Sequence, residues 1–296
     1  MEFLGEDHLK QSLKEVTWRD YLEKWRDTTL EDWIFRGQPC QESKKISLKS
    51  GFERALTSYD IPFSKAPEIE EWMIREFRRK YEGIDSQIVI EDTLYCLSLM
   101  QHFWCPTRLL DCTYSPYIAA FFAVENMSIE QKGKREAFVF CFNHRWINKS
   151  AKKNIDNPKL FKKRFDDKTI NDKSFRALYM KKGRKKPFIV AENPHRLHRR
   201  LAIQKGVFII QGDITKTMMK NIEPMDEWQR KENVTINKLK IDTKEDLKEV
   251  YEDLRLMNIT HESLFPGLDG FARSLKQNLY WYRDLKGKKA KNSSFK

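Results

Sequence analysis

Three short runs of apolar residues in the second half of the chain constrain its fold most strongly. They are "EAFVFCFN" (136–143), "PFIVAEN" (187–193) and "GVFIIQGD" (206–213). Each run has the length of a strand and lacks the polar alternation of a surface strand, so each predicts a buried strand. "DWIFRGQ" (32–38) predicts a further short buried strand, and "KLKID" (238–242) closes the set. The chain therefore needs a sheet in its interior.

Helical patterns dominate the first 130 residues. Residues 1–30 have a loose apolar face, and "PEIEEWMIREFRRKYEG" (67–83) places its apolar residues on one face and ends at a glycine. Further helices are predicted in "IEDTLYCLSLMQHFW" (90–104), after the Ser115-Pro116 pair, and from Thr243 onward.

These elements predict an α+β fold, in which a helical N-terminal part packs on a small mixed or antiparallel sheet. We expect residues 1–285 to form a single domain with a basic insertion at about 149–186. Residues 286–296 then form a basic, flexible tail.

Composition indicates a cytoplasmic protein without a membrane partner. No apolar run approaches the roughly 20 residues that span a bilayer, and the N-terminus "MEFLGEDHLKQ" lacks the apolar core of a signal peptide. The cysteines are odd in number and scattered, at Cys40, Cys96, Cys105, Cys112 and Cys141. Their spacing matches no usual zinc site, so we expect reduced thiols and no metal.

The formal net charge of +13 is concentrated in two regions. Residues 149–186 contain 15 lysines and arginines against four acids, and "HRLHRRLAIQK" (195–205) follows. Such clusters favour a nucleic-acid partner, because they displace counterions from phosphates; a solvated basic surface is the alternative. The predicted nucleic-acid-binding residues are Lys181, Lys182, Arg184, Lys185, Lys186, Arg199 and Arg200. Phe161, Phe165, Phe175 and Tyr179 lie among these charges. They suit stacking on unpaired bases, which favours RNA over DNA; the alternative is that they anchor a surface helix.

The richest polar cluster is "QHFWCPTRLLDCT" (101–113). Pro106 disfavours helix at the preceding residue, so we expect a turn that brings polar side chains to the N-terminus of the next helix, a natural anion site. The side chains concerned are Thr107, Arg108, Asp111 and Thr113. Alternatively, Arg108 and Asp111 pair with each other and fix the turn. His102 is a candidate general base, or a core histidine beside Phe103.

A second candidate is Arg36, which ends the apolar run "DWIFRGQP" (32–39). A guanidinium group there must reach solvent or an anion, and Gly37 permits another backbone to approach closely. Gln204 and Gly206 form a third candidate, at the start of a later strand. They place a side-chain amide and a backbone without a side chain there, where a ligand could bind; the alternative is that they only form the turn that begins the strand.

Four stretches together resemble the FRG domain, which is named for its Phe-Arg-Gly signature. They are "WIFRGQ", "QHFWCPTRLLDCTYSPYIAAFFA", "AIQKGVFII" and "SLFPGLDGFARSL", and they span residues 33–275. The resemblance makes residues 1–285 an FRG-type domain. Many members of this family are bacterial and occur near mobile or defence-related genes, which implies a role in antiphage defence. The family name assigns no reaction, and Cys112 departs from the aromatic residue that is common at its position.

The order of motifs is also similar to that of ADP-ribosyltransferases. In that resemblance Arg36 meets a phosphate of NAD, Thr113 takes the hydroxyl position, and Gln204 stands where a glutamate is usual. Glu192 or Glu262 then supplies the carboxylate, with Glu262 preferred. The resemblance implies an ADP-ribosyltransferase-like core that uses NAD as a substrate. The catalytic candidates are Arg36, Thr113, Gln204 and Glu262. The NAD-binding candidates are Arg36, Gly37, Gln38, His102, Thr107, Arg108 and Asp111.

Three functions follow from these observations. The first is an NAD-dependent ADP-ribosyltransferase-like toxin or effector that acts on nucleic acid, with RNA preferred, and that needs a neutralising antitoxin or regulatory protein in its own cell. The second is a non-catalytic module that binds nucleic acid or a nucleotide. The third is a metal-independent nuclease that uses His102 and Asp111.

Overall fold

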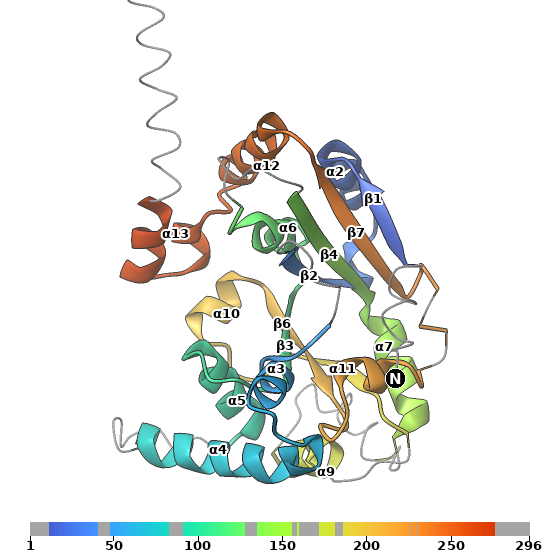
Figure 1. Ribbon diagram of the computed structural model, residues 1–296, viewed down its shortest axis with the longest axis vertical. Helices are drawn as coiled ribbons and strands as arrows, with labels where there is room; N and C mark the ends of the chain where they lie inside the picture. The colour runs from blue at the N-terminus through green and yellow to red at the C-terminus, as the bar shows by residue number, and fades with distance from the viewer. Residues whose placement is uncertain are drawn as a thin grey trace, which may run out of the picture.

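The computed structural model describes residues 12–40, 48–82, 91–127, 135–155, 159, 172–180, 186–225, 227–228 and 230–275. A seven-stranded mixed sheet, in the order β1-β7-β4-β2-β3-β6-β5, forms its centre (Figure 1). The strands are β1 (Leu13–Val16), β2 (Trp33–Cys40), β3 (Leu109–Thr113), β4 (Arg135–Asn143), β5 (Ile189–Glu192), β6 (Gly206–Gln211) and β7 (Val234–Ile241). Strand β1 pairs with β7 in parallel, and the other neighbouring strands are antiparallel.

Helices surround this sheet, and two short 3-10 turns lie at Leu30–Asp32 and Phe63–Lys65. The helices are α2 (Trp18–Asp27), α3 (Gly51–Ser58), α4 (Ala66–Glu82), α5 (Thr93–His102), α6 (Pro116–Val124), α7 (His144–Asn154), α9 (Asp172–Tyr179), α10 (Arg199–Ile203), α11 (Met218–Ile222), α12 (Lys244–Leu256) and α13 (His261–Leu264). Residues 268–275 are also helical. The predicted α+β class is therefore confirmed.

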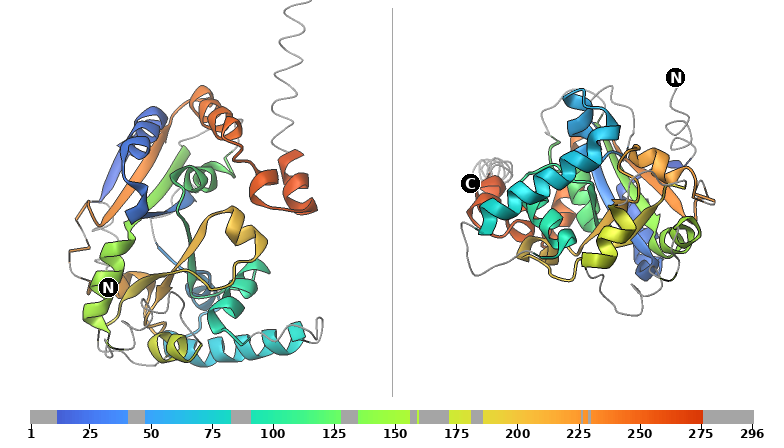
Figure 2. Two further views of the ribbon diagram at one scale, coloured as in Figure 1. Left: turned by 180° about the vertical axis from the view of Figure 1, so that it is seen from behind. Right: turned by 90° about the horizontal axis from the view of Figure 1, so that it is seen from below.

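The sheet divides between β2 and β3. These two strands meet at a single residue pair, Phe35 with Thr113, whereas β2 pairs with β4 along its whole length. Figure 1 shows β1, β7 and β4 together in the upper part of the molecule, and β3 and β6 below them. The view from behind in Figure 2 shows the same separation, with α2 and α12 at one end and α4 at the other. The sheet is therefore continuous across β2 and β3 at one residue pair only.

Two apolar cores lie on opposite faces of β2 and β4. One contains Ile34 and Phe140 and extends over β3, β5 and β6 to α5, α7 and α9. The other contains Phe35 and Val139 and is covered by α2, α6 and α12. Neighbouring residues of one strand point to opposite faces, so both faces of these strands are apolar. This explains the continuous apolar run in β4.

The same alternation explains the Phe-Arg-Gly signature. Phe35 and Gly37 face helix α6, and Arg36 points to the opposite face. A Cβ atom on Gly37 would lie 1.9 Å from the backbone oxygen of Ala119 in α6. The glycine is therefore needed for the close approach of strand to helix.

Most predicted elements are confirmed, and the differences have clear causes. Helix α6 begins after Ser115, whose side chain accepts from the backbone N–H of Ile118, and Thr243 caps α12 in the same way. The predicted helix in residues 1–30 is wrong for 13–16, which form β1 because they pair with β7. Residues 109–113 form a strand rather than part of a turn, because β6 pairs with them.

Residues 276–296, including the predicted basic tail, lie outside the described residues. So do 156–158, 160–171 and 181–185 of the predicted basic insertion. The single domain therefore stays a prediction. Within the described part of the chain, the helices are too short or too polar to cross a bilayer.

Candidate functional site

A cavity of about 540 Å³ opens where β2 and β3 separate. Its cationic lining residues are Arg36, Lys49, Arg54, Arg200 and Arg273, and its carboxylates are Asp111 and Glu125. The predicted catalytic and NAD-binding residues that line it are Arg36, Gly37, His102, Thr107, Asp111, Thr113 and Gln204. Segments distant in sequence thus converge on one cavity, and its excess of positive charge favours an anionic ligand.

Arg36 projects from β2 toward this cavity. Its Nη1 atom donates a hydrogen bond to the backbone oxygen of Asp111, at 2.8 Å. Its Nε atom is buried and has no hydrogen-bond partner among the described residues. Within the described chain no carboxylate lies within ion-pair distance of this guanidinium group. Arg36 therefore keeps donors for a ligand, and a planar guanidinium group suits bidentate binding of a phosphate.

A short hydrogen-bond chain joins helix α5 to β3 at the floor of the cavity. The side-chain amide of Gln101 donates to Oδ1 of Asp111, and Thr107 Oγ1 donates to the amide oxygen of Gln101. Thr107 and Asp111 are thereby held in place. Gln101 was not among the predicted site residues, although it begins the motif that contains them.

Thr113 and Gln204 connect the cavity to α10 and α13. Thr113 Oγ1 donates to the backbone oxygen of Gln204 at 2.7 Å and accepts from the backbone N–H of Ser115 at 3.0 Å. The side-chain amide of Gln204 donates to the backbone oxygen of Leu264 at 3.1 Å. Both side chains line the cavity, and both also stabilise its wall.

Glu125, directly after α6, is the glutamate that lines the cavity. Burial raises the pKa of its carboxyl group to about 7, although the nearby guanidinium groups of Arg273 and Arg200 act in the opposite direction. No hydrogen bond or ion pair joins it to another described residue. Sequence reasoning missed Glu125; the available signal was an acid directly after the apolar helix "YIAAFFAV".

Two histidines lie together in the cavity wall. The ring centroids of His102 and His198 are 4.7 Å apart. Burial, with a contribution from Arg200, lowers the pKa of His102, and burial lowers that of His198 to about 4. Both imidazoles are therefore neutral near pH 7. The Nδ1 atom of His102 is buried without a partner among the described residues, which leaves this ring able to serve as a base.

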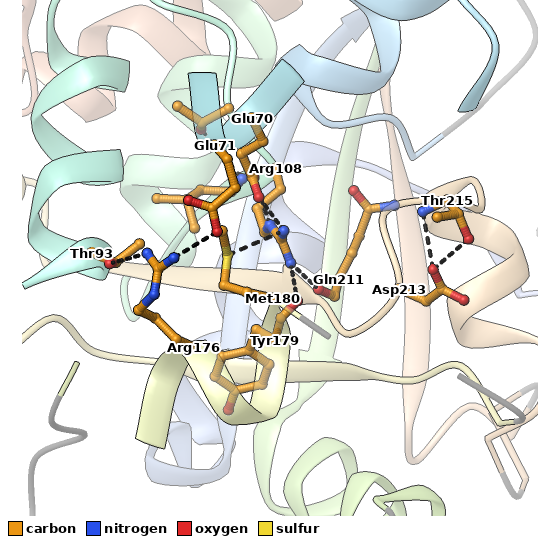
Figure 3. Close-up of polar contacts among 12 residues, drawn as sticks. Glu70, Glu71, Thr93, Arg108, Arg176, Tyr179, Met180, Gln211, Asp213 and Thr215 are labelled. Carbon is orange, nitrogen blue, oxygen red and sulfur yellow. Dashed lines mark hydrogen bonds and ion pairs between the residues drawn. The ribbon is translucent and has the colours of Figure 1, made fainter. Parts of the chain in front are cut away.

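Arg108 is buried in the core and is not among the residues that line the cavity. Figure 3 shows its polar contacts. Its guanidinium group forms a bidentate ion pair with Glu70 and donates to the backbone oxygens of Tyr179, at 2.6 Å, and Gln211, at 3.3 Å. Its side chain is 1% exposed. The prediction that Arg108 pairs with Asp111 is wrong. As all of these donors point to protein acceptors, the structure places Arg108 in a structural network rather than at a ligand.

The remaining carboxylate candidates also lie outside the cavity lining. Glu262 is exposed on α13, and Glu192 is buried, where its carboxylate accepts from the hydroxyl group of Tyr179. Gln38 is half-buried on β2 and is not among the lining residues either.

The predicted nucleic-acid surface is described only in part. Lys181, Lys182, Arg184 and Lys185 lie outside the described residues, while Lys186 and Arg199 are exposed. Arg200 lines the cavity, with its guanidinium carbon 4.4 Å from the ring centroid of Phe265. Of the four aromatic residues proposed to stack on bases, Phe175 and Tyr179 are buried core residues, so that prediction is wrong for them. Phe161 and Phe165 lie outside the described residues.

Comparison with curated proteins and with solved structures found no match. The family model of the FRG domain matches residues 31–132. This stretch runs from the start of β2 past the end of α6 and includes the Phe-Arg-Gly signature and the motif of residues 101–123. The match supports the resemblance to the FRG domain over this stretch, which is about a third of the chain.

Proposed function

We propose that the cavity binds NAD and that the protein is an ADP-ribosyltransferase-like effector. The observation that carries the proposal is Arg36, an arginine without an ion-pair partner among the described residues, placed where the sheet divides. Arg54 and Lys49 line the same cavity, and the excess of cations there suits the diphosphate of a dinucleotide.

The reaction that fits this site breaks the bond between the ribose C1′ atom and the nicotinamide nitrogen. Nicotinamide leaves with the electron pair, and a nucleophilic oxygen or nitrogen of the acceptor bonds to C1′ and releases a proton. A carboxylate beside the sugar stabilises the positive charge that develops on it. Glu125 is the candidate for this role, in place of Gln204 and Glu262.

The acceptor in this proposal is a nucleic acid, with RNA preferred. Its support is the net charge of +13 and the concentration of lysine and arginine in residues 149–186. A toxin of this kind needs an antitoxin or regulatory protein in its own cell, and the family's occurrence near defence-related genes supports a role in antiphage defence.

A second candidate function is a nucleotide-binding module without catalysis. It is favoured by Gln204, whose side-chain amide is bonded to the backbone of α13 at the position where a transferase usually has a glutamate. Release of nicotinamide from NAD distinguishes the two functions. Cleavage of labelled RNA in the absence of NAD tests the third, a nuclease that uses His102 and Asp111.

The experiment uses the full chain, NAD labelled in its adenylate part, and RNA, DNA or protein as acceptor. Wild type should release nicotinamide and label the RNA, and its melting temperature should rise in millimolar NAD, because a ligand that binds the folded state stabilises it. Arg36→Ala should lose both effects, and Arg36→Lys should not restore them, because lysine lacks the bidentate fork.

Arg75→Ala is the control, since Arg75 is an exposed residue of α4 outside the cavity, paired with Glu76. It should behave like wild type. A wild-type protein whose melting temperature is unchanged by NAD, and which releases no nicotinamide, would refute the proposed function.

A further inference from the structure

Trp104, at the end of helix α5, lies on the cavity wall in an unusual conformation. Its backbone has a φ of 65°, in the left-handed region, and its side chain is 71% exposed. The N–H of Trp104 bonds to the oxygen of Gln101 at 3.1 Å, and the N–H of Cys105 bonds to that of Met100 at 2.9 Å. This pair of bonds ends a helix in the Schellman motif, whose left-handed position usually takes glycine or asparagine.

Two other helices of this chain end in the same way with suitable residues. Helix α3 has Asp60 at the left-handed position, with φ 53°, and α12 has Asn258, with φ 57°. Asp and Asn tolerate this conformation because their short polar side chains bond locally, whereas a bulky residue with positive φ is strained. The end of the helix therefore does not explain a tryptophan at position 104. Packing does not explain it either, because a ring so exposed gains little stability from burial.

The surroundings of the indole ring indicate what it is for. The guanidinium carbons of Arg273 and Arg200 lie 5.5 Å and 5.6 Å from its centroid. The guanidinium carbon of Arg200 also lies 4.4 Å from the ring centroid of Phe265. A cation–π contact uses the charge of a guanidinium group rather than its hydrogen bonds, so its N–H groups can still donate to an anion. One ring and two cations are thus placed together at one end of the cavity.

We propose that Trp104 is the base-stacking surface of a nucleotide subsite, with Arg200 and Arg273 as ligands of that nucleotide's phosphate. The inference rests on the proposed function only in taking the cavity's ligand to be a nucleotide. An aromatic heterocycle joined to a phosphate matches an exposed indole beside two guanidinium groups. The cavity volume of about 540 Å³ suits a nucleotide-sized ligand.

The test compares AMP with ribose 5-phosphate, which has the sugar and phosphate but no base. Calorimetric titration of the full chain should show that wild type binds AMP more tightly than ribose 5-phosphate. Trp104→Gly and Trp104→Asn should weaken AMP binding by about 5- to 150-fold, the range expected for the loss of one base stack, and should leave ribose 5-phosphate binding nearly unchanged. Trp104→Phe should keep most of the preference.

Thermal melts separate this role from a structural one. Trp104→Gly and Trp104→Asn should melt at or above the wild-type temperature, because both residues relieve the left-handed strain. Trp72→Ala is the matched control: Trp72 is a tryptophan of α4 that is 54% exposed and outside the cavity, so its loss should not change AMP binding.

Three results would overturn the inference: equal wild-type affinities for AMP and ribose 5-phosphate, an unchanged preference in Trp104→Gly, or no AMP binding at all. Binding of an RNA oligonucleotide that needs Trp104, without AMP binding, would assign the ring to a nucleic acid instead. AMP binding that depends on Trp104, with no release of nicotinamide from NAD, would refute the proposed transferase and leave the subsite standing.

Discussion

Replacing Glu125 by glutamine removes a carboxyl group whose ionisation destabilises the folded protein. Burial raises the pKa of Glu125 from 4.5 to about 7. In both the folded and the unfolded protein, the Glu125 carboxyl group is neutral well below pH 4.5 and ionised well above pH 7. Between these values it is ionised mainly in the unfolded protein, so the unfolding free energy falls as pH rises and is level above this range. At about 1.36 kcal/mol per pKa unit, the loss amounts to at most about 3 kcal/mol.

The assay is urea denaturation of wild type and Glu125→Gln between about pH 4.5 and pH 8. The difference in unfolding free energy between the two proteins should grow with pH by up to about 3 kcal/mol in favour of the variant. Glu223→Gln is the control, because Glu223 also follows a short helix as its C-terminal cap but is exposed to solvent. Its unfolding free energy should stay close to that of wild type, because an exposed side chain contributes little to stability.

The same variant tests the proposed chemistry. If ionised Glu125 stabilises the charge on the sugar, wild-type nicotinamide release should rise through about pH 7, and Glu125→Gln should lose it even where the variant is the more stable protein. A stability difference between the two proteins that is constant over the whole pH range would refute the reasoning, since the carboxyl group would then not be ionising in a desolvated site.

Three further predictions follow from the packing and the charge. Gly37→Ala should unfold at a much lower temperature or fail to fold, because its Cβ would lie 1.9 Å from a backbone oxygen, whereas Gly51→Ala, with its nearest atom at 3.5 Å, should be tolerated; equal melts would contradict this. Glu70→Ala should lower the unfolding free energy in urea by about 3–5 kcal/mol, because it leaves Arg108 charged and unpaired. Adding Arg108→Met should recover part of this loss, and additive losses from the two substitutions would disprove the coupling. Charge reversal of the lysines in 181–186 should weaken RNA binding and flatten its salt dependence; an unchanged salt slope would indicate a solvated surface.

Sequence reasoning worked where the determining interactions are local. The start of α6 could be predicted because Ser115 and Pro116 are adjacent to it. Arg36 could be identified as a candidate because a charge at the end of an apolar strand must reach solvent or bind an anion. By contrast, β3 was missed because "LLDCT" becomes a strand through pairing with β6, nearly a hundred residues later.

The candidate site shows the same limit. Arg108 was expected at a ligand because its partner, Glu70, is 38 residues away and no local pattern connects them. Glu125 and Trp104 look ordinary in the sequence. Their importance comes from α6, α5 and α10 converging on one cavity, and from a backbone conformation that only the structure reveals.

The division of the sheet also affects how the protein can aggregate. Among the described strands, β2 beyond Phe35 pairs with β4 alone, and β3 before Thr113 pairs with β6 alone. Each therefore has an inner edge at the divide, in addition to the outer edges of β1 and β5. Unpaired strand edges are templates for intermolecular association. A ligand in the cavity lies beside these inner edges, so we expect it to slow aggregation during storage as well as to raise the melting temperature.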